Sequence, residues 1–162
     1  MATHPGSCRC ATCGAPAPLL NYGYQAPDCV WAQPATERSP RNNVDFTEFG
    51  DRRFVRGLLP VRLATGEEFR FGVWLEVDAT TFTEIVSTWH DEARYPHLRF
   101  SATIANAVTP WHSLILGAPV DAGVRHQDAR PFVTAARMPW LQGVLERGWT
   151  TAEYEAVVAS FR

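Results

Sequence analysis

The sequence predicts an α+β protein whose antiparallel sheet is built on a long β-hairpin. Two observations indicate this fold class. Residues 53–77 contain two runs in which apolar and polar side chains alternate, which is typical of strands. After residue 78 apolar residues recur at helical spacing, directly behind the hairpin and again near the C-terminus. We therefore expect one helix packed after the hairpin, a helical C-terminus, and an irregular N-terminal arm that carries a Cys-x-x-Cys motif.

The second strand of the hairpin has the clearer pattern. Between the two strands, Gly66 can adopt the positive φ that a short hairpin loop usually needs. Pro60 donates no hydrogen bond, so the first strand is expected to lie at a sheet edge or to bend there. One face of the second strand is wholly apolar and is made by Phe69, Phe71, Val73, Leu75 and Val77.

Asp78 is a suitable N-cap for a helix that follows the hairpin. The apolar stripe of this helix should cover the apolar face of the hairpin. Further strands are predicted at residues 98–104, 112–120 and 130–136, because these short apolar runs are bounded by turn formers. The stripe consists of Phe82, Ile85, Val86 and Trp89.

Two short helices are predicted at the C-terminus. Pro139 opens the first and Gly148 ends it. Thr150 and Glu153 have the spacing of a capping box for the second. Its core-facing residues are Tyr154, Val157, Val158 and Phe161.

The composition changes near residue 50. Residues 1–50 are rich in Pro, Gly and turn formers and form the predicted arm, anchored on the domain by aromatic residues. A helical turn is allowed around residues 35–38. Residues 51–162 are expected to form a single α+β domain.

Charge and composition exclude several functions. The net charge is −2 and the sequence pI is near 6.2, which disfavours a nucleic-acid partner. All fifteen basic residues are arginine, so lysine-dependent catalysis is excluded. No apolar run is long enough to span a bilayer, and the N-terminus lacks the features of a signal peptide. These observations predict a cytoplasmic protein without a membrane partner.

The four cysteines allow two interpretations. Cys10 and Cys13 have the spacing of a zinc knuckle, and Cys8, Cys29 or His4 could complete a structural zinc site. No second Cys-x-x-Cys motif is present. The alternative is that the cysteines are plain reduced thiols, as expected in a cytoplasmic protein.

The mixed face of the hairpin is the candidate ligand site. Arg56, Arg70 and Trp74 lie on it, and guanidinium groups beside an indole suit an anionic ligand. The alternative is a solvated face with ordinary cross-strand charge pairs, which Glu76 and Arg62 could supply.

No catalytic set is recognisable. The remaining histidines have no partner at metal-ligand spacing, and no nucleophile elbow or phosphate-binding loop is present. The sequence therefore favours a non-enzymatic protein-binding module, since aromatic and arginine side chains anchor interfaces. The alternative is a small-molecule or anion-binding protein, or an enzyme, that uses the Arg/Trp face. A cleft with convergent polar groups would favour the second class.

Several motifs resemble a bacterial family catalogued as domain of unknown function 2199. They are CATCG, YGYQAPD, ERSPR, RRFVRGLLPVRL and FRFGVWLEVDATTF, in this order. The resemblance is strongest over residues 53–82 and becomes weaker after Phe100. The chain departs from the family pattern where a histidine is usual after the Cys-x-x-Cys-Gly turn, and where Met138 precedes Pro139 in place of histidine. The resemblance implies the knuckle and the fold, and no activity.

Overall fold

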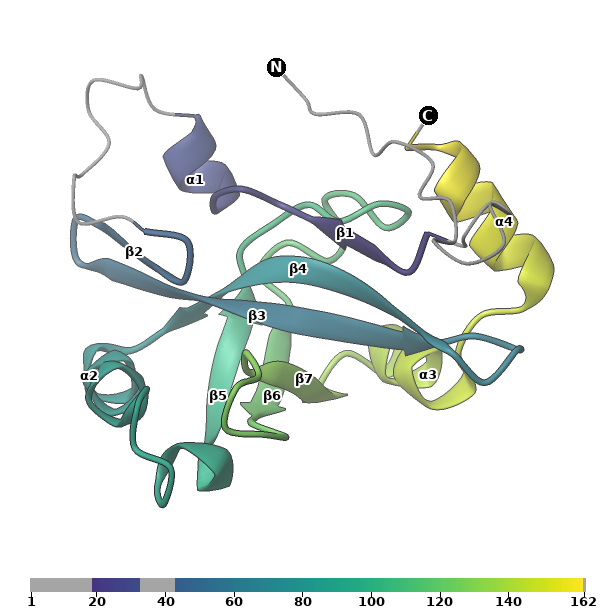
Figure 1. Ribbon diagram of the computed structural model, residues 1–162. Coiled ribbons are helices and arrows are strands. Elements are labelled where there is room, and N and C mark those ends of the chain that lie inside the picture. The colour runs from purple at the N-terminus through teal and green to yellow at the C-terminus, as the bar shows by residue number, and fades with distance from the viewer. Residues whose placement is uncertain (1–18, 33–42, 162) are drawn as a thin grey trace, which may run out of the picture.

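A computed structural model describes residues 19–32 and 43–161, and its core is a closed five-stranded barrel (Figure 1). The central hairpin is β3 (Arg52–Arg62) and β4 (Glu68–Val77), which pair antiparallel over ten residue pairs. The sheet continues through β5 (Arg99–Ile104), β6 (Pro119–Gly123) and β7 (Phe132–Ala136). β7 pairs with β3, which closes the barrel.

The predicted α+β class is confirmed, and the sheet differs from the prediction in two ways. It closes on itself, whereas the sequence predicts an open antiparallel sheet. It also contains two parallel pairings, of β3 with β7 and of β4 with the short strand β1 (Asn21–Gly23). β2 (Phe46–Phe49) pairs antiparallel with the start of β3. Alternation along one strand cannot reveal closure, because a barrel interior and the buried face of an open sheet have the same pattern.

The predicted arm therefore contributes regular elements to the sheet. β1 and β2 both pair with the hairpin, and α1 (Asp28–Trp31) lies between them in the chain. The helical turn allowed at residues 35–38 lies outside the described residues. The division of the chain at residue 50 stays a prediction.

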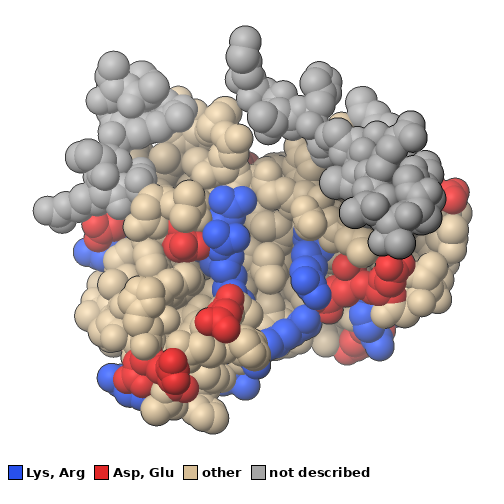
Figure 2. All heavy atoms as spheres, viewed as in Figure 1, with Lys and Arg blue, Asp and Glu red and all other residues tan. Residues whose placement is uncertain are grey.

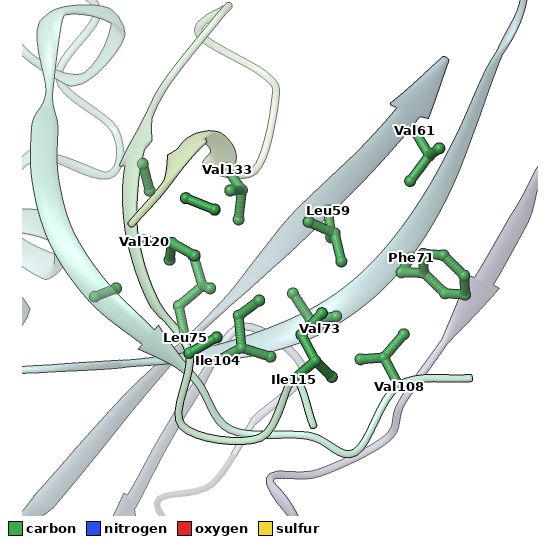
Figure 3. Packing of buried hydrophobic residues seen from close by; sticks show 14 of the residues in the cluster. Leu59, Val61, Phe71, Val73, Leu75, Ile104, Val108, Ile115, Val120 and Val133 are labelled. Carbon is green, nitrogen blue, oxygen red and sulfur yellow. The ribbon is translucent and has the colours of Figure 1, made fainter. Parts of the chain in front are cut away.

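The barrel interior is filled by apolar side chains from all five strands (Figure 3). The face of β4 predicted to be apolar is buried throughout, and Leu75 is fully buried. Gly57 faces inward diagonally across from it, opposite Val73: a Cβ at this position would lie 2.6 Å from Leu75 Cδ1. The small residue therefore makes room for the leucine in a close-packed interior. The residues labelled in Figure 3 are Leu59, Val61, Phe71, Val73, Leu75, Ile104, Val108, Ile115, Val120 and Val133.

Helix α2 (Ala79–Thr88) begins as predicted: the Asp78 carboxylate accepts a hydrogen bond of 2.7 Å from the Thr81 amide. Its role is smaller than predicted. Ile85 is buried, but Val86 is 44 % exposed. The other barrel strands, and not this helix, cover most of the apolar face of the hairpin, so α2 needs only a narrow contact stripe.

Two further predictions about the strands are corrected by the structure. The fourth strand was predicted at residues 112–120, but only its end is strand, since β6 begins at Pro119. The preceding residues form turns, with Leu114 exposed to 71 %. Pro60 lies in β3, which is an internal strand, yet the described pairing with β7 is confined to Leu58. The proline thus occupies a locally unpaired side of β3.

The C-terminal helices form as predicted. α3 (Pro139–Arg147) ends at Gly148, which has a φ of 74°, and α4 (Thr151–Ala159) carries the capping box of Thr150 and Glu153. The segment between these helices is fastened to the hairpin, because the Trp149 amide donates to the Arg62 carbonyl at 2.8 Å. A short 3-10 helix, η2 (Tyr95–His97), precedes β5. Among the described helices none is both long and apolar enough to cross a membrane.

Candidate anion-binding site

The outer face of the hairpin carries the predicted ligand residues in three neighbouring cross-strand rows. Arg56 pairs with Trp74 and Leu58 with Gly72 in the first two rows. Arg70 pairs with Pro60 in the third. Figure 2 shows basic side chains on both sides of an uncharged strip over the hairpin. The register therefore places Arg56 and Arg70 on either side of a row with little side-chain bulk.

Two glycines form the floor beside Arg56. Gly23 of β1 is the register partner of Gly72 in β4, so the two share the outer face. A Cβ on Gly23 would lie 2.8 Å from Arg56 Nη2, and one on Gly72 would lie 3.5 Å from it. The guanidinium of Arg56 thus occupies space that side chains at these two positions would fill. We call Arg56, Arg70, Gly23, Gly72 and Leu58 the arginine face.

Arg56 is a half-buried cation whose side chain has no hydrogen-bond acceptor among the described residues. Its Nε is inaccessible to solvent and has no hydrogen-bond acceptor, and the described residues provide no ion pair for the guanidinium. The guanidinium makes a cation–π contact with Trp74: its Cζ lies 5.9 Å from the centroid of the indole ring. Burial lowers the pKa of Arg56, and positive Arg130 nearby lowers it further, against the opposing effect of Asp45. Arginine stays protonated in proteins, so this charge persists.

Trp74 is buried and supports the site from below. It belongs to a second apolar cluster on the outer side of the barrel, with Val30 and Phe54. Its indole Nε1 donates to the Tyr24 carbonyl at 3.0 Å. The Trp74 ring is therefore held in a fixed position beneath the Arg56 guanidinium and is itself only 1 % exposed.

Arg70 is exposed and paired. Its Nε lies 2.9 Å from Glu68 Oε1, and Arg125 contacts both oxygens of the same carboxylate at 2.9 and 3.1 Å. Burial raises the pKa of Glu68, but the two arginines outweigh this effect, and its pKa is lowered overall. The charge-pair interpretation therefore applies to Arg70, as it does to Arg52 and Glu76 further along the hairpin. It does not apply to Arg56.

An open cleft of about 560 Å³ runs along the outer side of β3. Leu58 and Arg70 contribute to it from the hairpin. Arg130 lines it from the opposite side and pairs with Asp45 at 2.7 Å. The buried Tyr95 lies in the wall and donates to the Ala129 carbonyl at 2.8 Å. The remaining lining residues are Trp89, His90, Gln127, Asp128 and Ala129.

The sequence motifs miss half of this site. Arg130 and Asp45 come from loops far apart in the chain. The Arg56 amide donates to the Asp45 carbonyl and the Leu58 amide to the Pro131 carbonyl, and these bonds, with the pairing of β2 and β7 to β3, bring both loops to the hairpin. Gly72 was the detectable signal, since a glycine inside a strand often marks a close approach by another group.

The predicted metal ligands are mostly untested. Cys8, Cys10, Cys13 and His4 lie outside the described residues. Cys29 is described as a free, half-buried thiol. Burial is the main cause of its raised pKa. In the described residues no three His, Cys, Asp or Glu side chains are grouped to hold a metal ion.

The described structure is thus a small closed barrel with helices at its margins and a basic outer face. A family model described as "Uncharacterized protein conserved in bacteria (DUF2199)" matches residues 9–139. The chain belongs to this bacterial family, which confirms the resemblance seen in the sequence. No curated protein and no solved structure matches the chain.

Proposed function

We propose that the protein binds a carboxylate or phosphate group on the arginine face, with Arg56 as the central contact. The observation that carries this proposal is the unpaired guanidinium of Arg56. Buried charges in folded proteins are normally paired, because removing an ion from water is costly. Arg56 keeps its proton and the described residues supply no anion for it, so we infer that a bound anion pairs with it.

The surroundings of Arg56 support this proposal. Its guanidinium occupies the space that side chains at Gly23 and Gly72 would fill, and it lies over the Trp74 ring. Arg130 lies close enough to Arg56 to lower its pKa and pairs with Asp45, and further along the hairpin Arg70 and Arg125 share the Glu68 carboxylate. The cleft is lined by Arg70 and Arg130 and not by Arg56, and a cleft favours a ligand-binding protein over a flat interaction surface.

The other functional predictions rest on the sequence alone and stay proposals. A protein partner is compatible with the same site if the partner supplies the anion. A structural zinc ion on Cys10 and Cys13, with Cys8, Cys29 or His4, is proposed from motif spacing. We propose no catalytic residue.

Phosphate provides the test. Thermal unfolding is measured in phosphate and in chloride at equal ionic strength, for the natural chain and for Arg56→Met. Phosphate should raise the Tm of the natural chain more than that of the variant, because a ligand that binds only the folded state stabilises it. In chloride, Arg56→Met should be as stable as the natural chain or more stable, since it removes a half-buried charge that the described residues leave unpaired.

Arg137→Met is the matched control. Arg137 is an exposed arginine that pairs with Asp121, and it should retain the full phosphate effect. Any general salting-out by phosphate stabilises all three chains alike. An equal phosphate shift in all three chains would refute anion binding at Arg56.

A further inference from the structure

The outer edge of β1 is exposed and lies directly beside the arginine face. β1 is the terminal strand of the sheet, and its other side pairs with β4. On that side Leu20 accepts from the Arg70 amide at 2.9 Å, and Tyr24 donates to the Gly72 carbonyl at 2.8 Å. Successive residues of a strand direct their backbone groups to opposite sides. The backbone groups of Asn21 and Gly23 therefore point away from β4.

These backbone groups have no hydrogen-bond partner among the described residues, and Asn21 and Gly23 are both exposed. Unpaired groups along a sheet edge are a template for an added strand. β1 carries no proline or charged residue, which are two of the means by which proteins block such an edge, and its short length is a third. The edge is three residues long, so it can pair with only a short segment.

We propose that this edge binds an extended acidic peptide as an added strand, with an Asp or Glu side chain of the peptide opposite Gly23 and in contact with Arg56. The proposal rests on the proposed function and names the partner that supplies the anion. Side chains on directly opposed strand residues have Cβ atoms about 4.5–5.5 Å apart. Arg56 Nη2 lies 2.8 Å from the position that a Cβ of Gly23 would have. It therefore occupies the place in which a side chain at position 23 would face the side chain of the opposed peptide residue.

The geometry also explains why a peptide fits better than a free anion. Main-chain hydrogen bonds to Asn21 and Gly23 would supply affinity, and the Arg56 contact would supply specificity for an acidic residue at one position. A side chain at position 23 would separate the added strand from Arg56, which accounts for the glycine there.

The test uses three peptides and sodium acetate. The first peptide is acetyl-Thr-Val-Asp-Val-Thr-amide, and the second has Asn in place of Asp. The third is the Asp peptide N-methylated at Asp and at the C-terminal Thr, whose N–H groups face Gly23 and Asn21 when the added strand is antiparallel. Binding is followed by the NMR shifts of the Asn21 and Gly23 amides and of the Trp74 indole N–H. A charge-assisted hydrogen bond predicts that the Asp peptide binds about tenfold more tightly than the Asn peptide. This difference should disappear in Arg56→Met.

The outcomes separate the two proposals. N-methylation should abolish the shifts at Asn21 and Gly23, because it removes the donors that an added strand needs. If acetate binds as tightly as the Asp peptide and these two amides do not respond, the added strand is wrong and anion binding stands. If the Asn peptide binds as well as the Asp peptide, the acidic contact is wrong. If neither acetate nor any peptide gives a shift that depends on Arg56, both proposals fail.

Discussion

The Asn106 side chain accepts a hydrogen bond of 2.8 Å from the backbone amide of Trp74. Asn106 is fully buried, and its amide nitrogen donates to the Ala26 carbonyl at 2.8 Å and to Asp28 at 3.1 Å. One side chain thus joins the hairpin to the segment that contains α1. It holds the tryptophan that supports Arg56 and the chain that leads out of β1.

Asn106→Leu should therefore destabilise the protein strongly. It leaves the Trp74 amide and the Ala26 carbonyl without partners, and each unsatisfied buried group costs about 1–3 kcal/mol. Urea unfolding measures the loss. Asn43→Leu is a control at an exposed position whose side chain caps only a local turn. An equal loss in both variants would contradict the role assigned to Asn106.

Leu75→Ala should lower the free energy of unfolding by about 2–5 kcal/mol, the usual range for a buried leucine. Leu75 lies inside the barrel against a closely fitted neighbour, Gly57, so the cavity cannot easily collapse. Val86→Ala, on the exposed side of α2, should change the stability little. Denaturant unfolding of both variants checks this, and a small effect of Leu75→Ala would show that the strand does not face the core.

Gly23→Ala should weaken phosphate binding while the fold is retained. The new Cβ would meet the end of the Arg56 side chain, which can move aside but then leaves its place over the glycine floor. The stabilisation by phosphate should fall toward that of Arg56→Met. Gly143→Ala, in α3 with open space around it, is the control and should stabilise the helix by about 1 kcal/mol. An unchanged phosphate effect in Gly23→Ala would count against the proposed position of the anion.

The start of α4 should lose stability in acid. The Arg147 guanidinium and then the Thr150 amide lower the pKa of Glu153 to about 2, from 4.5. A carboxyl group whose pKa is lowered in the folded state stabilises the fold at pH values above its pKa in the unfolded chain. This contribution is lost as the pH falls from about 4.5 to about 2. Urea unfolding at several pH values should show a weaker acid dependence for Glu153→Gln. Glu155→Gln, an exposed change in the same helix, should behave as the natural chain does, and identical acid curves for both variants would refute the assignment.

Zinc on the N-terminal cysteines should appear in native mass spectrometry as a mass that a chelator removes. Cys10→Ser should abolish the zinc mass, since the knuckle needs both sulfurs. The Tm of the barrel should not change, because its core includes no cysteine. A metal-free mass with four freely alkylated thiols would show that Cys10 and Cys13 are plain thiols.

Local patterns predict most of this fold because they report which face of an element is buried. The alternation through Val73 and Leu75, the cap at Asp78 and the capping box at Thr150 each depend on residues close in the chain. Barrel closure depends on residues far apart in the sequence, since it requires the pairing of Leu58 with Phe132. The site shows the same limit. Alternation places Arg56 on the outer face, but only the folded structure shows that Gly23 and Gly72 lie beside its guanidinium and that its Nε has no acceptor among the described residues.

The barrel closes along a narrow seam, with consequences for its motion. The described register pairs one residue of β3 with β7, against ten with β4. At the seam the Leu58 amide donates to the Pro131 carbonyl at 2.8 Å. Local opening is easiest where few hydrogen bonds must break together. Hydrogen exchange at Leu58 should therefore be faster than at β3 amides bonded to β4. An anion held between Arg56 on one side of the seam and Arg130 on the other would slow that exchange. The ligand would therefore suppress local opening of the barrel between β3 and β7.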